Sequence, residues 1–132
     1  MCLDTITQQY EPPNEEVKVG YKYFRELSNG LVRPPAYGAC QALEKWYDDP
    51  KNDILFAWAS HFVSATYQTG FHVLVSLSQA KAFWIGIMNP IHKIHLYKVE
   101  YRNVVASGTD DGANVDVARS IRVIEKLEDV NL

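Results

Sequence analysis

Charged side chains in the last third of the chain stand where the hydrophobic pattern predicts buried strands. Arg119 interrupts a row of valines and isoleucines that runs from Val115 to Val123. An unpaired guanidinium is costly to bury, so Arg119 needs an anionic partner or an opening to solvent. Two alternatives follow: an internal salt bridge, for which Glu100 is the candidate, or a bound phosphate, whose geometry an arginine fork matches.

Polar residues also share one face of two candidate neighbouring strands. The first strand contributes Lys98, Glu100 and Arg102, and the second contributes Asp116, Ser120 and Arg122. Such a face is usually exposed to solvent. It is also the composition expected for the wall of a nucleotide or sugar-phosphate pocket, because arginines bind phosphate and carboxylates bind hydroxyls.

His72 lies in a strongly apolar segment and shares a strand face with Leu74. It is either a core histidine that bonds a backbone carbonyl or a polar contact to a ligand. His61, His92 and His95 have no cysteine or carboxylate at the short spacings of zinc sites, so we expect no metal. The sequence also lacks a GxSxG elbow, a Walker loop and a GxGxxG loop, so we expect no catalytic triad and no cofactor.

Composition limits the class of protein. The chain has 132 residues, enough for one domain, with 47% hydrophobic and 22% charged residues and a net charge of −3. The acidic balance argues against binding to a nucleic-acid polymer. The sequence has no apolar run of membrane-spanning length and no signal-peptide pattern, and its two cysteines are not spaced as a redox motif. We therefore expect a cytoplasmic protein with no membrane partner.

The hydrophobic periodicity predicts which elements position these side chains. Alternation predicts strands at 17–23, 31–33, 70–75, 94–105 and 115–124, and favours a strand over a helix at 54–67. Ser76 with Gln79 forms a capping-box signature for a helix that ends near Gly86, and a second short helix is expected at 39–47. Turns are expected at 28–30 and 109–112.

These elements predict an α+β fold: a single domain over 1–132, with a mostly antiparallel sheet and one or two packed helices. Residues 1–16 are expected to form a polar extended arm, and 125–132 a polar tail with helical potential.

Three segments resemble the ADP-ribosyltransferase pattern. They are YKYF (21–24), GFHVL with SQAKAF (70–83) and LYKVEY with NVVASG (96–108), and the pattern that they mark out spans residues 21 to 108. The resemblance implies an NAD-using enzyme. The chain departs from that pattern in its first strand, where Tyr21 and Tyr23 stand in place of the usual histidine or arginine.

A second set of segments resembles the first-described anti-Thoeris family of phage proteins. These are MCLDTIT (1–7), VKVGYKYF (17–24), GFHVL (70–74) and DVARSIRVI (116–124). The resemblance implies a phage-encoded sponge in the host cytoplasm. Such a protein binds cyclic ADP-ribose signals without cleaving them, thereby inhibits bacterial defence, and forms homo-oligomers.

Both resemblances imply a ligand that contains ADP-ribose. The candidate ligand-binding residues are Phe71, His72, Phe83, Arg102, Asn103, Asp116, Arg119 and Arg122. We expect the site where the end of the 70–75 strand, the helix start at Ser76 and Arg102 with Asn103 converge. Aromatic content and the apolar opening at 3–6 favour a homo-oligomer. The alternatives are an NAD-using enzyme and a non-catalytic protein-interaction module.

Overall fold

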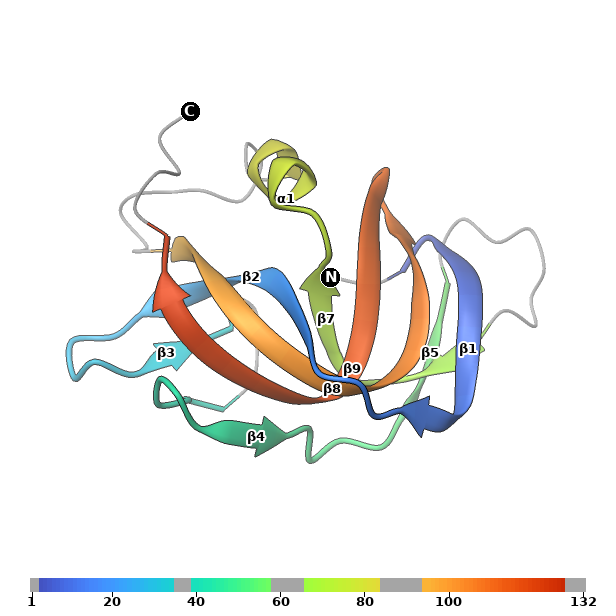
Figure 1. Ribbon diagram of the computed structural model, residues 1–132, viewed down its shortest axis with the longest axis horizontal. Coiled ribbons are helices and arrows are strands. Elements are labelled where there is room, and N and C mark those ends of the chain that lie inside the picture. The colour runs from blue at the N-terminus through green and yellow to red at the C-terminus, as the bar shows by residue number, and fades with distance from the viewer. Residues whose placement is uncertain (1–2, 35–38, 58–65, 84–93, 128–132) are drawn as a thin grey trace.

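The computed structural model describes residues 3–34, 39–57, 66–83 and 94–127 (Figure 1). Within these ranges the chain is mostly antiparallel sheet with one short helix, α1 (Leu77–Phe83). The strands are β1 (Thr5–Asn14), β2 (Lys18–Glu26), β3 (Val32–Arg33), β4 (Trp46–Asp48), β5 (Ile54–Phe56), β6 (Thr66–Gln68), β7 (Phe71–Leu74), β8 (Ile94–Asp110) and β9 (Ala113–Lys126). The predicted mostly antiparallel sheet is confirmed.

The long hairpin of β8 and β9 is the centre of the sheet. β8 pairs with β9 along one edge, and along its other edge with β2 and then β1. β7 bridges β2 and β9, so the pairings β8–β2, β2–β7, β7–β9 and β9–β8 form a closed ring. β4 extends the sheet from β9, and β3 extends it from β2. Figure 1 shows both long strands strongly curved, with α1 above the concave side.

Residues that accept unusual backbone geometry shape the hairpin. Asn103 has a φ of 58° and lies beside a register shift between Val104 and Ala106, where β8 bends. Asp111 and Gly112 form the two-residue turn, with φ of 49° and 83°. Asp-Gly with positive φ at both positions is typical of the type I′ turn, whose twist matches the strands that it joins. The expected turn at 109–112 is confirmed.

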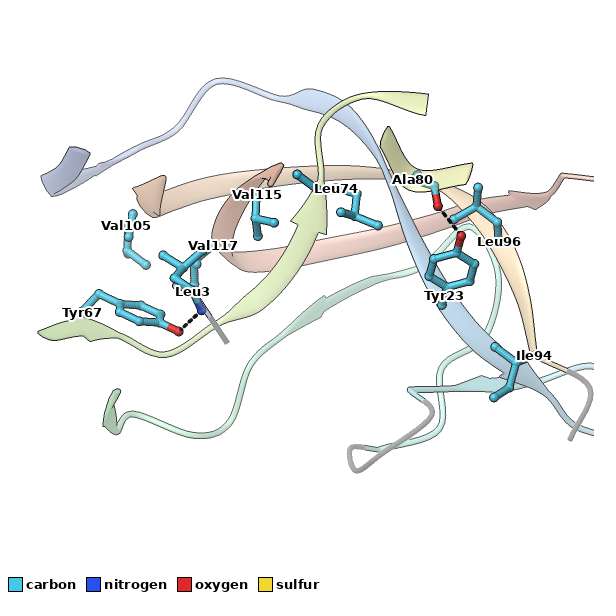
Figure 2. Packing of buried hydrophobic residues seen from close by; sticks show 12 residues of the cluster. Leu3, Tyr23, Tyr67, Leu74, Ala80, Ile94, Leu96, Val105, Val115 and Val117 are labelled. Carbon is cyan, nitrogen blue, oxygen red and sulfur yellow. Dashed lines mark hydrogen bonds between the residues drawn. The ribbon is translucent and has the colours of Figure 1, made fainter. Parts of the chain in front are cut away.

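Two buried clusters fill the space on either side of the curved sheet. The first extends from α1, where the Tyr23 hydroxyl donates to the carbonyl of Ala80, to Tyr67, whose hydroxyl accepts from the backbone N–H of Leu3 (Figure 2). The second contains Phe24, Val32, Val73, Tyr97, Val99, Tyr101, Val104, Ala118, Ile121 and Val123. Leu3, the first residue of the apolar N-terminal segment 3–6, is fully buried in the first cluster and so packs in the chain's own core.

Most predicted strands are confirmed, and several are longer or shorter than expected. The segment 94–105 belongs to a strand that continues to Asp110, and the polar arm is extended as β1, which pairs with β8. The segment 54–67 begins and ends in strand, as β5 and β6. The expected end of the helix near Gly86 and the tail from 128 onward lie outside the described residues.

The helix expected at 39–47 is wrong. Gln41 makes an isolated β-bridge to Val32, Glu44 has a φ of 65°, and Trp46 begins β4. The spacing of apolar residues in this segment fits a helix, but pairing to the exposed edge of β9 satisfies its backbone groups instead. This tertiary pairing outweighs the local propensity.

Candidate functional site

One face of the adjacent strands β4, β9 and β8 carries two cross-strand rows of mostly polar side chains. In the first row Trp46 lies opposite Arg122, which lies opposite Glu100. In the second row Asp48 lies opposite Ser120, which lies opposite Arg102. We call these six residues the Trp46 face. The polar faces predicted on two neighbouring strands are therefore directly paired.

Arg102 is held over the ring of Trp46. Its guanidinium carbon lies 4.2 Å from the ring centroid, and that of Arg122 lies 5.5 Å away. A guanidinium stacked on an indole uses its flat face, so its N–H donors, which lie in the plane, stay available to an anion. Among the described residues, Arg102 has no carboxylate within ion-pair distance.

The other members of the Trp46 face bond one another. Arg122 donates through its Nε to Glu100 Oε1 at 2.9 Å, and a second guanidinium nitrogen binds the same oxygen. The Ser120 hydroxyl donates to Asp48 Oδ1 at 2.5 Å and accepts from the Asn103 amide at 3.2 Å. Most of the charge of Arg122 is thus used within the chain, which leaves Arg102 as the available cation.

His72 is a satisfied core histidine. Its Nδ1 lies 3.2 Å from the carbonyl of Gly70, so this nitrogen carries the proton and donates, while Nε2 accepts from the Tyr67 hydroxyl at 3.0 Å. Burial, together with the nearby Lys22 ammonium, lowers the pKa of His72 to about 3. Of the two alternatives for His72, these contacts match the core histidine that bonds a backbone carbonyl. Phe71, the preceding residue, packs against the second buried cluster.

Asp116 lies in a buried network between β8 and β9. Its Oδ2 accepts from the Tyr101 hydroxyl at 2.7 Å, and its Oδ1 accepts from the Ser107 hydroxyl at 2.6 Å. Burial and the bond to Asp116 raise the pKa of the Tyr101 phenol far above its ordinary range. Both oxygens of this carboxylate therefore have partners within the chain.

Arg119 bonds two backbone carbonyls rather than a carboxylate. Its guanidinium donates to Thr69 at 2.5 Å and to Asp49 at 2.7 Å, and its own carbonyl accepts from the N–H of Asp49 at 2.9 Å. The salt bridge to Glu100, one of the two alternatives for Arg119, is not formed, because Glu100 binds Arg122. Arg119 thus ties two connecting segments to β9.

The predicted convergence of the site is wrong. Val75 and Gln79, at the helix start, bond the backbone of Asn114 on β9, whereas Arg102 lies opposite Ser120, six residues further along that strand. Of the eight candidates, Arg102, Asn103 and Arg122 lie together on or beside the Trp46 face. Phe83 is the last residue of α1, and its side chain lies outside the described part of the structure.

Sequence reasoning missed Trp46 and Asp48 as site residues. Trp46 falls within the helix expected at 39–47, and Asp48 directly follows that segment. A strand of only three residues has too little alternation to reveal itself, so no local signal identified β4.

No His, Cys, Asp or Glu cluster suited to a metal ion occurs among the residues that the structure describes. In the same residues, no helix has the length and apolar character needed to cross a membrane. The chain matches no protein-family model, no curated protein and no solved structure.

Proposed function

We propose that this protein binds an anionic nucleotide of the cyclic ADP-ribose type on the Trp46 face and holds it without cleaving it. The observation that carries the proposal is the Arg102 guanidinium, stacked on Trp46 and without an acidic partner among the described residues. The sequence resemblance to anti-Thoeris proteins supplies the particular ligand. On this proposal the protein is phage-encoded and acts in the host cytoplasm by removing an immune signal.

Each part of the ligand has a chemically suitable partner. The diphosphate accepts hydrogen bonds from the free edge of Arg102, because arginine forks match two phosphate oxygens. A purine stacks on the aromatic surface of Trp46 that is left open, since this side chain is only partly buried. Ribose hydroxyls donate to the exposed carboxylate of Asp48 and bond the amide of Asn103.

The bonds within the Trp46 face favour binding over turnover. The Glu100 carboxylate is engaged by Arg122, and the Ser120 hydroxyl donates to Asp48 rather than to a histidine. A serine nucleophile needs an adjacent base to remove its proton. These bonds support a site that binds its ligand and releases it without a chemical reaction.

A release experiment tests the proposal. The protein is incubated with a cyclic ADP-ribose isomer, washed free of unbound ligand and denatured by heat, and the supernatant is analysed by chromatography. We expect the intact isomer in the supernatant. A linear product or, when NAD is supplied, free nicotinamide would support the NAD-using enzyme instead. Retention of no nucleotide at all would support a protein-interaction module.

A further inference from the structure

Two arginines stand directly opposite each other at one end of the sheet. In the antiparallel pair of β2 and β3, Arg25 is the cross-strand partner of Arg33. Directly opposite residues project from the same face, with Cβ atoms about 5 Å apart. Like charges in this position destabilise a sheet, so the fold carries a cost here that it must offset.

Neither arginine forms an ion pair with a carboxylate in the described structure. The ion pairs of the described residues do not include Arg25 or Arg33, and the Nε atom of each is buried without a hydrogen-bond partner. The next acidic residue on β2 is Glu26, which points to the other face and binds Lys126 and His95.

The sequence around the pair supplies no carboxylate either. The residues that follow β3, at 34–38, and those that precede β8, at 84–93, contain no aspartate or glutamate. On β8, the residue opposite Arg25 is Ile94, which is buried and apolar. Among the described residues, the cross-strand neighbour of Arg25 on β8 is therefore apolar and offers no counter-charge.

We propose that Arg25 and Arg33 form an anion site for a phosphate-type oxyanion, built from different strands than the Trp46 face. Two guanidinium groups on adjacent strands present convergent N–H donors, and a tetrahedral dianion satisfies both at once. Binding removes the like-charge repulsion and supplies acceptors for donors that lack them. A terminal phosphate or a diphosphate of a nucleotide has this chemistry, as does free inorganic pyrophosphate.

The test uses inorganic pyrophosphate and the full chain, in an Arg102→Gln background that removes the cation of the Trp46 face. Binding is measured by calorimetry at low ionic strength, and thermal midpoints are recorded with and without the anion. We expect Arg33→Gln to weaken pyrophosphate binding at least tenfold. Without the anion, Arg33→Gln raises the thermal midpoint, because a repulsion has been removed.

Arg33→Lys provides the matched control for charge. It keeps the positive charge but loses the two-pronged fork, so we expect weaker binding with no gain in the thermal midpoint. Two results would overturn the proposal: unchanged pyrophosphate affinity in Arg33→Gln, or a thermal shift that sodium chloride reproduces at equal ionic strength. Because Arg102 is absent throughout, neither result bears on the Trp46 face.

Discussion

At the scale of single residues, the Asp116 carboxylate joins the two longest strands from within. Its partners Tyr101 and Ser107 both lie on β8, whereas Asp116 itself lies on β9. A hydrogen bond to a charged acceptor contributes about 1.5–3 kcal/mol, more than a neutral one. The carboxylate is therefore a structural group whose charge is satisfied by hydroxyl donors.

We expect Asp116→Asn to lower the free energy of unfolding by about 2–3 kcal/mol, because an amide offers one acceptor where the carboxylate offers two. Urea denaturation followed by circular dichroism measures the change. Asp111→Asn is the control, since asparagine tolerates the positive φ at that turn position. Equal stability of the two variants would show that the buried network contributes nothing.

His72 predicts a loss of stability in mild acid. Its pKa in the folded protein is about 3, against 6.5 when unfolded, so between these values only the unfolded chain binds the proton. Stability is therefore fully present above pH 6.5 and falls as the pH drops below it, by up to about 1.4 kcal/mol per pH unit.

Urea titrations at pH 7.5, 6.5, 5.5 and 5.0 measure this slope. We expect His72→Gln to flatten the slope. A slope in His72→Gln equal to that of the parent protein would assign the acid sensitivity to other groups.

At the scale of elements, a glycine permits β1 to join the sheet. A Cβ on Gly108 would lie 2.0 Å from the carbonyl oxygen of Thr5, a distance that no side chain tolerates. The close approach of these two backbones places Ile6 opposite Gly108 in the register. The polar N-terminal arm thus depends on one position of β8 for its pairing.

We expect Gly108→Ala to detach β1 from β8 while the β8–β9 hairpin persists. Hydrogen exchange of backbone amides measures this: the β1 amides lose protection, and those of β9 keep it. Gly112→Asn is the control, because that glycine has a positive φ that asparagine accepts and nothing within 4 Å of its absent side chain. Protected β1 amides in Gly108→Ala would contradict the account.

The sequence predicted elements with strong local signals and missed those that depend on long-range pairing. The alternation of β8 and β9, the Asp-Gly turn and the N-cap all have local causes. In the observed cap, the Ser76 hydroxyl accepts from the Gln79 N–H at 3.4 Å. Gln79 itself bonds Asn114 on β9, which no local pattern indicates.

In the candidate site, too, residues with a local sequence signal were predicted, and those placed by long-range pairing were missed. The paired polar rows of β8 and β9 follow from alternation, so Arg102 and Arg122 were identified correctly as neighbours. Trp46 joins them only because β4 pairs with the far edge of β9. His72 and Arg119 were ambiguous because a buried polar group bonds equally well to a ligand or to a backbone carbonyl, and sequence does not distinguish these partners.

At the scale of the whole molecule, the ring of pairings explains how a chain with one short described helix encloses two cores. Strands that pair on both edges leave no exposed hydrogen-bonding edge over the length that they share. Because β8 bends at Asn103, it pairs with β2 along the first part of its edge and with β1 along the second part. The Trp46 face lies across three of these paired strands, β4, β9 and β8.

Homo-oligomerisation stays a prediction, which now rests on exposed apolar residues of β2 and the segment before it. Val17 and Val19 are 49% and 47% exposed, whereas Leu3 is buried within the chain. We expect sedimentation velocity at micromolar concentration to give a species of at least twice 15.0 kDa, and Val19→Lys to shift it toward the monomer. A 15.0 kDa species alone in the parent protein would contradict this prediction.

Calorimetric titration with a cyclic ADP-ribose isomer tests whether the nucleotide binds on the Trp46 face. The titration compares the parent chain with Arg102→Gln and Lys98→Gln. Both variants lose one positive charge from the same strand, but only Arg102 lies over Trp46. We expect Arg102→Gln to weaken binding at least tenfold, because a charge-assisted hydrogen bond is lost, and Lys98→Gln to weaken it less than about threefold. Equal affinities for Arg102→Gln and the parent chain, or equal losses in the two variants, would contradict the Trp46 face as the binding site.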